Sequence, residues 1–211
     1  MTLDWVTISS LATAGGTLVL AVATFSSVRS ANRTAAAAER SLLVGLRPVL
    51  MTSRRDDPAQ KIMYGDEKWV TIPGGAAVGE VDGDVVYLAM SLRNAGNGLG
   101  VLHGWHFYPS RQDAMQEHPD IEKFRNQSRD MYVPVGDTGF WQAAFRDKDD
   151  PEYGPALEAI GTRQPVAIDL LYGDHEGGQR VITRFTMAPR QDGSWLPSVI
   201  RHWNVDRPDP R

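Results

Sequence analysis

The first uncharged stretch of the chain limits its possible folds more than any other feature. From Trp5 to Val28 there are 24 consecutive residues without Lys, Arg, Asp or Glu. A helix rises about 1.5 Å per residue, so a helix of this length crosses a hydrocarbon layer of roughly 30 Å. Eight of these positions are Ser or Thr, whose hydroxyls can bond to carbonyls of their own helix within lipid. We therefore predict a transmembrane helix over residues 5–28.

Two other interpretations compete with this anchor. Ala21-Val22-Ala23 resembles a signal-peptide cleavage site, but signal peptides begin with a basic segment, whereas Asp4 precedes this stretch. A buried helix of a soluble protein is the second alternative, and the length of the uncharged stretch argues against it. We expect the stretch to remain in the protein as a membrane anchor.

The charges that flank the stretch predict its orientation. Only Asp4 precedes it, whereas Arg29, Arg33, Arg40 and Arg47 follow it. Lys and Arg are retained on the cytoplasmic side of membranes. We therefore predict that the N-terminus lies outside and that the rest of the chain lies on the cytoplasmic face of the inner membrane.

The helix is expected to continue beyond the membrane as far as Pro48. The alanines at 35–38 favour helix, and Pro48 forces Arg47 towards an extended backbone. Small residues at Ala12 and Gly16 are spaced as in helix pairs that pack closely in membranes, which suggests a homo-oligomer through this helix. Alternatively, the apolar stripe of the juxtamembrane segment docks on the chain's own body. The predicted organisation is a helix over 1–46, a body over 47–205 and a flexible tail over 206–211.

From residue 47 onward the hydrophobic pattern has a period of two, which is typical of strands. The Gly-rich turn 94–98 indicates a hairpin or a Greek-key corner, and the polar turn 173–178 indicates a hairpin. About eight short strands with hardly any helix between them favour a mainly β protein, an antiparallel β-sandwich of the Ig-like kind. The predicted strands cover 49–52, 69–72, 86–92, 99–107, 132–135, 140–146, 166–172, 181–187 and 195–205.

Composition excludes several classes of function. The formal net charge is -4, so no overall positive field favours nucleic acid. The chain has no cysteine, which excludes thiolate metal sites, iron–sulfur clusters and cysteine nucleophiles. We find no nucleophile-elbow, phosphate-loop or zinc-protease motif. The sequence therefore predicts no catalytic residue, no metal and no cofactor.

One loop nevertheless carries residues that suit a binding site. Asp174, His175 and Glu176 are adjacent in a predicted turn, and they could bind a cation or form a base with an orienting acid. His202 joins them only if the last strand runs alongside. The alternative is an ordinary solvated turn, because three adjacent side chains rarely converge on one point. His103 lies on an apolar row, where a core histidine is the simpler interpretation.

Three segments carry a resemblance to a known group of proteins. They are the anchor with Glu39 and Arg47-Pro48, the corner Leu92 to Gly98, and the ending with Tyr172-Gly173-Asp174, Arg184-Phe185, Trp195 and Arg201-His202-Trp203. Together they resemble uncharacterised bacterial single-pass membrane proteins that have a short N-terminal span and a C-terminal β domain. The resemblance implies this architecture and no activity.

Three functions are compatible with these features. The first is a cytoplasmic binding or scaffolding module that is anchored in the membrane and recognises a protein partner. The second is a ligand sensor or hydrolytic enzyme with a pocket near Asp174, His175 and His202. The third is a structural subunit of a membrane complex.

Overall fold

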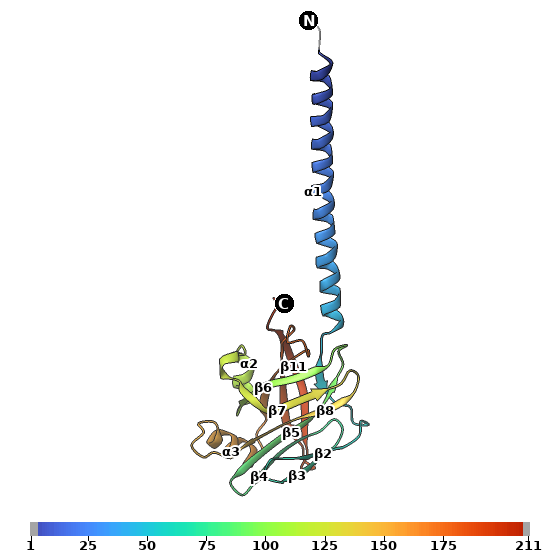
Figure 1. Cartoon of the computed structure of the whole chain (residues 1–211). Coiled ribbons are helices and arrows are strands. Elements are labelled where there is room, and N and C mark those ends of the chain that lie inside the picture. The colour runs from blue at the N-terminus through green and yellow to red at the C-terminus, as the bar shows by residue number, and fades with distance from the viewer. Residues whose placement is uncertain (1–3, 209–211) are drawn as a thin grey trace. The chain divides into compact units, whose positions relative to one another are not determined.

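The computed structural model describes residues 4–208, and the chain divides into two compact units between Val44 and Gly45. The first unit is helix α1 (Trp5–Gly45), in which residues 8–43 include a window of mean hydropathy 1.7 (Figure 1). This helix is long and apolar enough to span a membrane. Its apolar side chains Leu11, Leu18 and Phe25 are between 66% and 70% exposed.

Four hydroxyl groups of α1 bond to its own backbone, as the sequence predicts: those of Thr13, Thr17, Ser26 and Thr34. Thr13 Oγ1 donates to the Ser9 carbonyl at 2.9 Å, and Thr17 Oγ1 donates to the Thr13 carbonyl at 2.9 Å. These bonds satisfy polar groups that would otherwise face an apolar surrounding.

The second unit is the β body, which is mainly antiparallel sheet. Its strands are β1 (Leu50–Thr52), β2 (Gln60–Met63), β3 (Trp69–Ile72), β4 (Ala77–Asp82), β5 (Val85–Asn94), β6 (Gly100–Tyr108), β7 (Arg125–Val133), β8 (Thr138–Phe145), β9 (Val166–Gly173), β10 (Val181–Pro189) and β11 (Trp195–Asn204). Two short helices, α2 (Arg111–Gln116) and α3 (Tyr153–Gly161), and the 3-10 turn η1 (Ile121–Lys123) complete it.

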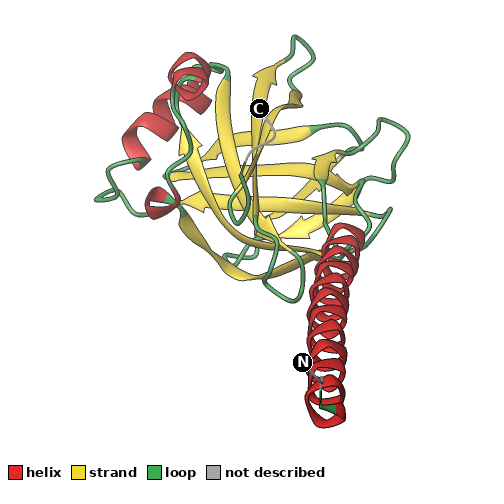
Figure 2. Ribbon diagram, turned by 90° about the horizontal axis from the view of Figure 1, so that it is seen from above, coloured by secondary structure: helices red, strands yellow, loops and turns green. Residues whose placement is uncertain are grey.

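Nine of the strands form one continuous antiparallel sheet in the order β1-β5-β4-β11-β10-β9-β6-β7, with β8 also paired to β5. The sheet curves over a single core, so that its strands form a sandwich-like body (Figure 2). The separate hairpin of β2 and β3 packs Ile62 and Tyr64 against the outer face of β5, at Tyr87 and Ala89. This architecture confirms the predicted mainly β, antiparallel, sandwich-like fold behind an N-terminal apolar helix.

The inner face of the sheet carries the alternating apolar residues and three aromatic side chains that pack edge to face. The rings of Trp105 and Trp141 lie 5.6 Å apart, and the rings of Trp105 and Phe145 lie 5.5 Å apart. Helix α3 contributes Ala156 and Ile160 to the same core. The outer face is covered in part by short segments, and the candidate site lies there.

The turn at 94–98 forms a corner rather than a hairpin. Strand β5 pairs with β1, β4 and β8, whereas β6 pairs with β7 and β9. The buried side chain of Asn94 fixes the corner, because its Nδ2 donates to the carbonyls of Gly98 at 2.7 Å and Val133 at 3.0 Å. Its Oδ1 accepts from the backbone N–H groups of Gly96 at 2.9 Å and Val49 at 3.2 Å. The hairpin predicted around 173–178 is confirmed, since β9 pairs with β10.

The sequence misplaced several elements. Strands β2 and β4 were not predicted, and β7 begins at Arg125 rather than near residue 132. Between α2 and β7 the chain forms only the three-residue turn η1. His103, expected in the core, lies instead at a register shift between Leu102 and Gly104 and is half-buried.

Candidate functional site

The structure places the predicted loop residues in two different settings. Asp174 is 1% exposed, and its carboxylate accepts from the Gly178 backbone N–H at 2.9 Å and from Gln179 Nε2 at 3.2 Å. His175 and Glu176 have side chains that are 51% and 68% exposed, with 3.4 Å between Nε2 and Oε1. Asp174 therefore shapes its own loop, while its two neighbours face solvent.

His202 belongs to another network. Its Nδ1 lies 2.7 Å from Thr183 Oγ1, which lies 2.8 Å from the hydroxyl of Tyr172. The Tyr172 hydroxyl in turn accepts from the Leu50 backbone N–H at 3.1 Å. These bonds connect His202 to buried groups of β9, β10 and β1, whereas the bonds of Asp174 stay within its turn.

A row of ionisable residues crosses the outer face of the sheet, and sequence reasoning missed it. His106 of β6 lies opposite Asp169 of β9, Asp169 lies opposite Arg184 of β10, and Arg184 lies opposite Arg201 of β11. Residues in such opposed positions are side-chain neighbours on one face of a sheet. The register thus brings together four residues from distant parts of the sequence. We call them the cross-strand row.

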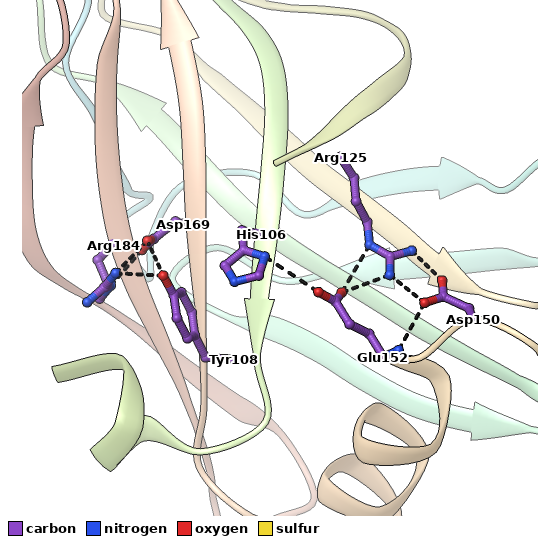
Figure 3. A network of polar contacts seen from close by, with 7 residues as sticks. All are labelled: His106, Tyr108, Arg125, Asp150, Glu152, Asp169 and Arg184. Carbon is purple, nitrogen blue, oxygen red and sulfur yellow. Dashed lines mark hydrogen bonds and ion pairs between the residues drawn. The ribbon is translucent and has the colours of Figure 1, made fainter. Parts of the chain in front are cut away.

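Arg184 is the centre of this row, and it is 1% exposed. Its Nε and Nη2 donate to the two oxygens of Asp169 at 2.7 and 2.6 Å, so the pair is bidentate (Figure 3). Nη2 also donates to the Tyr108 hydroxyl at 3.0 Å, and Nη1 donates to the carbonyls of Ala114 and Glu117. All five N–H groups of the guanidinium therefore have acceptors.

The segment around α2 is attached to the sheet through these bonds. Ala114 is fully buried against Tyr108 and Ala167, and its carbonyl accepts from Arg184. Burial alone would lower the pKa of the Arg184 guanidinium. The bonds to Asp169 and its negative charge have the larger combined effect, so the pKa is raised. Burial, followed by the nearby Asp169 charge, raises the pKa of the Tyr108 hydroxyl. Arg184 thus remains charged and Tyr108 neutral, and both serve to hold α2.

The opposite end of the row contains a second charged cluster, also drawn in Figure 3. Arg125 at the start of β7 donates through Nε to Glu152 Oε2 at 3.0 Å and through Nη2 to Asp150 Oδ1 at 2.6 Å. His106 Nδ1 lies 3.6 Å from Glu152 Oε1. Burial is the main cause that lowers the pKa of His106. The cluster ties β7 to the segment before α3, and each of its charged groups has an oppositely charged neighbour.

A pocket of about 240 Å³ opens at the other end of the row, beyond Arg184. Arg184, Arg201 and Trp203 come from neighbouring strands, and the segment after α2 forms the rim. The complete lining is Met115, Gln116, Glu117, His118, Arg184, Ile200, Arg201 and Trp203. We call this the outer-face pocket.

Two buried N–H groups at this pocket have no acceptor within residues 4–208. They are Arg201 Nε and Trp203 Nε1. The Arg201 side chain forms no hydrogen bond or ion pair with the described part of the chain, and its guanidinium lies 5.2 Å from the centre of the Trp203 ring. Arg184 lies 4.9 Å from the same ring. Trp203 itself is only 5% exposed, so the two guanidiniums and the indole form a packed wall.

His118 is the remaining titratable ring at this pocket. Its Nδ1 lies 3.1 Å from the Pro119 carbonyl oxygen. The ring packs edge to face against Trp203 at 5.9 Å. The pocket therefore has two N–H groups of β11 without acceptors among the described residues beside an aromatic wall, which suits a ligand that carries hydrogen-bond acceptors.

Comparison with protein-family models, with curated proteins and with solved structures found no match to this chain. Within the part of the chain that the structure describes, no group of three or more His, Asp or Glu side chains is placed to hold a metal ion. Fold and geometry define a mainly β body with a donor-lined pocket on its outer face, joined in sequence to a helix of membrane-spanning length.

Proposed function

We propose that the protein is a membrane-tethered binding module whose β body takes its ligand in the outer-face pocket. In this proposal residues 5–28 cross the inner membrane of a bacterium, and the body lies on the cytoplasmic side. The length and hydropathy of α1 support the tether, and the arginines at 29, 33 and 40 support the orientation. The protein partner and the helix-mediated oligomer that the sequence suggests stay predictions.

The observation that carries the binding role is the pair of buried donors without acceptors, Arg201 Nε and Trp203 Nε1. An unsatisfied buried donor costs about 1–3 kcal/mol, so most native proteins avoid one. Two such groups beside one pocket favour a ligand that supplies the missing acceptors. Side chains at a binding site often rearrange slightly on binding, which allows a ligand to reach N–H groups just below the surface.

The same groups favour binding over catalysis. Arginine stays protonated at physiological pH, and an indole N–H only donates. Neither group takes up a proton from a substrate or attacks one. Arg184, the other cation of the pocket wall, has already used all its donors on Asp169, Tyr108 and two carbonyls.

A ligand screen with a blocked pocket tests this proposal. The full-length chain in detergent would be unfolded thermally in the presence of a library of small polar compounds, because a ligand that binds only the native state raises the melting temperature. Ile200→Trp places a larger side chain in the pocket lining. Val135→Trp, at a position that is 52% exposed elsewhere on the body, is the matched control.

We expect compounds that stabilise the wild type and Val135→Trp but not Ile200→Trp. At a ligand concentration of 100 times Kd the stabilisation is about 2.7 kcal/mol, which is several degrees for a domain of this size. If the three proteins respond alike to every compound, the outer-face pocket is not a ligand site and the proposal is wrong.

A further inference from the structure

We infer that the outer-face pocket binds a small organic monocarboxylate, with Arg201 and Trp203 as the residues that hold the carboxylate. This inference rests on the proposed function, because it names the ligand class of the same pocket. Three observations carry it: the charge at the pocket, the arrangement of its donors and the nature of its walls.

One guanidinium at the pocket, that of Arg201, has no carboxylate partner among the described residues, which suits a ligand group with a single negative charge. Arg184 is neutralised by Asp169, at 2.6 Å between Nη2 and Oδ2, and both residues are buried. Arg201 forms no ion pair with the residues that the structure describes. The exposed side chain of Glu117 at the rim adds a negative charge. A phosphate group, with a charge of about -1.5 to -2 at pH 7, would meet one unpaired guanidinium and the repulsion of Glu117.

The donors at the pocket match the shape of a carboxylate. The Nε–H of a guanidinium and the neighbouring Nη–H point in parallel, and this planar fork fits the two oxygens of a carboxylate. Nε of Arg201 is buried and has no acceptor among the described residues, and the Arg201 side chain lines the pocket, so a small movement of this side chain would turn the edge that contains Nε towards a ligand. Trp203 Nε1 offers one further N–H to a carboxylate oxygen. Contact with the Trp203 ring at 5.2 Å holds the guanidinium in place before a ligand arrives.

The remaining walls suit a short apolar group. Met115 and Ile200 line the pocket beside the aromatic ring of Trp203. The volume of about 240 Å³ lies below the roughly 300–1,000 Å³ that is usual for drug-sized ligands. A carboxylate with a short hydrocarbon chain therefore fits both the charged wall and the apolar wall.

The test uses hexanoate as the probe, hexanamide as its neutral analogue and inorganic phosphate as a competitor. Binding to the full-length chain in detergent would be followed by saturation-transfer NMR of the probe. Three variants change the holding residues: Arg201→Gln removes the charge, Arg201→Lys keeps the charge without the fork, and Trp203→Phe keeps an aromatic ring without the N–H. The matched control is Arg55→Gln, because Arg55 is exposed and lies outside the pocket.

We expect saturable binding of hexanoate to the wild type and to Arg55→Gln, with no comparable binding of hexanamide and no displacement by phosphate. Arg201→Gln and Arg201→Lys should weaken binding by about tenfold or more, since a bidentate charged contact is lost. Trp203→Phe should weaken binding by about threefold to tenfold for the loss of one neutral donor. The melting temperature of each variant checks that it is folded. Hexanoate binding to any one folded pocket variant is sufficient to test the inference.

Equal binding of hexanoate to the wild type and to the folded variants overturns the inference, as does equal binding of hexanamide or displacement by phosphate. The blocked variant Ile200→Trp separates this failure from failure of the proposed function. A pocket-dependent ligand that is neutral or phosphorylated would leave the binding role in place and exclude the monocarboxylate.

Discussion

Arg184 and Arg201 lie directly opposite each other on β10 and β11, yet within residues 4–208 only Arg184 has a carboxylate partner. Two neighbouring arginines repel each other unless one of them is neutralised. Asp169, opposite Arg184 on the other side, supplies this neutralisation within the sheet. Arg184 therefore stabilises the fold, whereas Arg201 has no carboxylate partner among the described residues and lines the outer-face pocket. Substitution of the two arginines should change the stability of the protein by different amounts.

We expect Arg184→Met to destabilise the protein by about 3–5 kcal/mol. The substitution leaves the fully buried carboxylate of Asp169 without its cation and removes the bonds to Ala114 and Glu117. Arg201→Met should cost less than about 1 kcal/mol, because no hydrogen bond of its side chain to the described residues is lost. Urea unfolding of the full-length chain in detergent, followed by tryptophan fluorescence, measures both. Similar costs for the two variants would contradict the assignment of these roles.

A double variant separates the buried charge from the packing. Asp169→Leu combined with Arg184→Met removes both charges and keeps apolar bulk, so we expect it to recover at least half of the stability that Arg184→Met loses. Recovery should be incomplete, since the Tyr108 hydroxyl and two carbonyls of the α2 segment lose a donor. No recovery would indicate that packing, rather than the uncompensated charge of Asp169, sets the cost.

Apolar patterning in the sequence predicted several strands correctly. Strands β3, β5, β9 and β10 show clear runs of apolar residues, and the structure has them close to the predicted bounds. Strands β2 and β4 were missed because Gln60-Lys61-Ile62-Met63 and Ala77 to Asp82 are short and carry charged or small residues. These strands owe their conformation to pairing and to packing on Tyr87 and Ala89 rather than to their own pattern.

The candidate site was missed for a different reason. The cross-strand row exists only through the register of four strands, and a period of two does not reveal which residues lie opposite each other. The sequence did contain one signal: Asp169 lies between Ile168 and Leu170 inside a predicted strand. Charged residues inside such runs are almost never fully buried unless they are paired. The sequence instead predicted a binding site in the loop of Asp174, because Asp174, His175 and Glu176 are adjacent in the chain.

The corner at 94–98 should not tolerate a side chain at Gly98. A Cβ atom there would lie 1.6 Å from the carbonyl oxygen of Leu46, which is a backbone atom that cannot move aside alone. We expect Gly98→Ala to cost at least about 3 kcal/mol, at the upper end for overpacking. Gly178→Ala is the control, since a Cβ there has no atom within 4 Å, and it should change stability by less than about 0.5 kcal/mol. Equal melting temperatures for the two variants would contradict this packing.

His106 should make the stability of the body depend on pH. Burial lowers the pKa of His106 despite the opposing charges of Glu152 and Asp169, so the folded protein binds fewer protons than the unfolded chain. An unperturbed histidine titrates near pH 6.5, so the contribution of His106 is complete above about pH 6.5. It is lost as the pH falls from there through the lower pKa of the folded state. We expect His106→Gln to flatten the fall in stability between about pH 7.5 and 5.5.

Chemical unfolding of the wild type and His106→Gln across this pH range measures the effect. His175→Gln is the control, because it also removes an imidazole but from a side chain that is 51% exposed. Its stability curve should run parallel to that of the wild type. If the curve of His106→Gln is also parallel to that of the wild type, His106 is not the group that makes the stability depend on pH.

The orientation of the anchor can be tested because the chain has no cysteine, so that one introduced cysteine is the only thiol available for labelling. Gln191→Cys places a thiol in an exposed turn of the body, and Trp5→Cys places one at the start of α1, where the side chain is 85% exposed. The arginines after the span predict that a membrane-impermeant maleimide labels Trp5→Cys in intact bacterial cells. Gln191→Cys should be labelled only after the cells are permeabilised, and labelling of Gln191→Cys in intact cells would reverse the proposed orientation and place the outer-face pocket outside the cytoplasm.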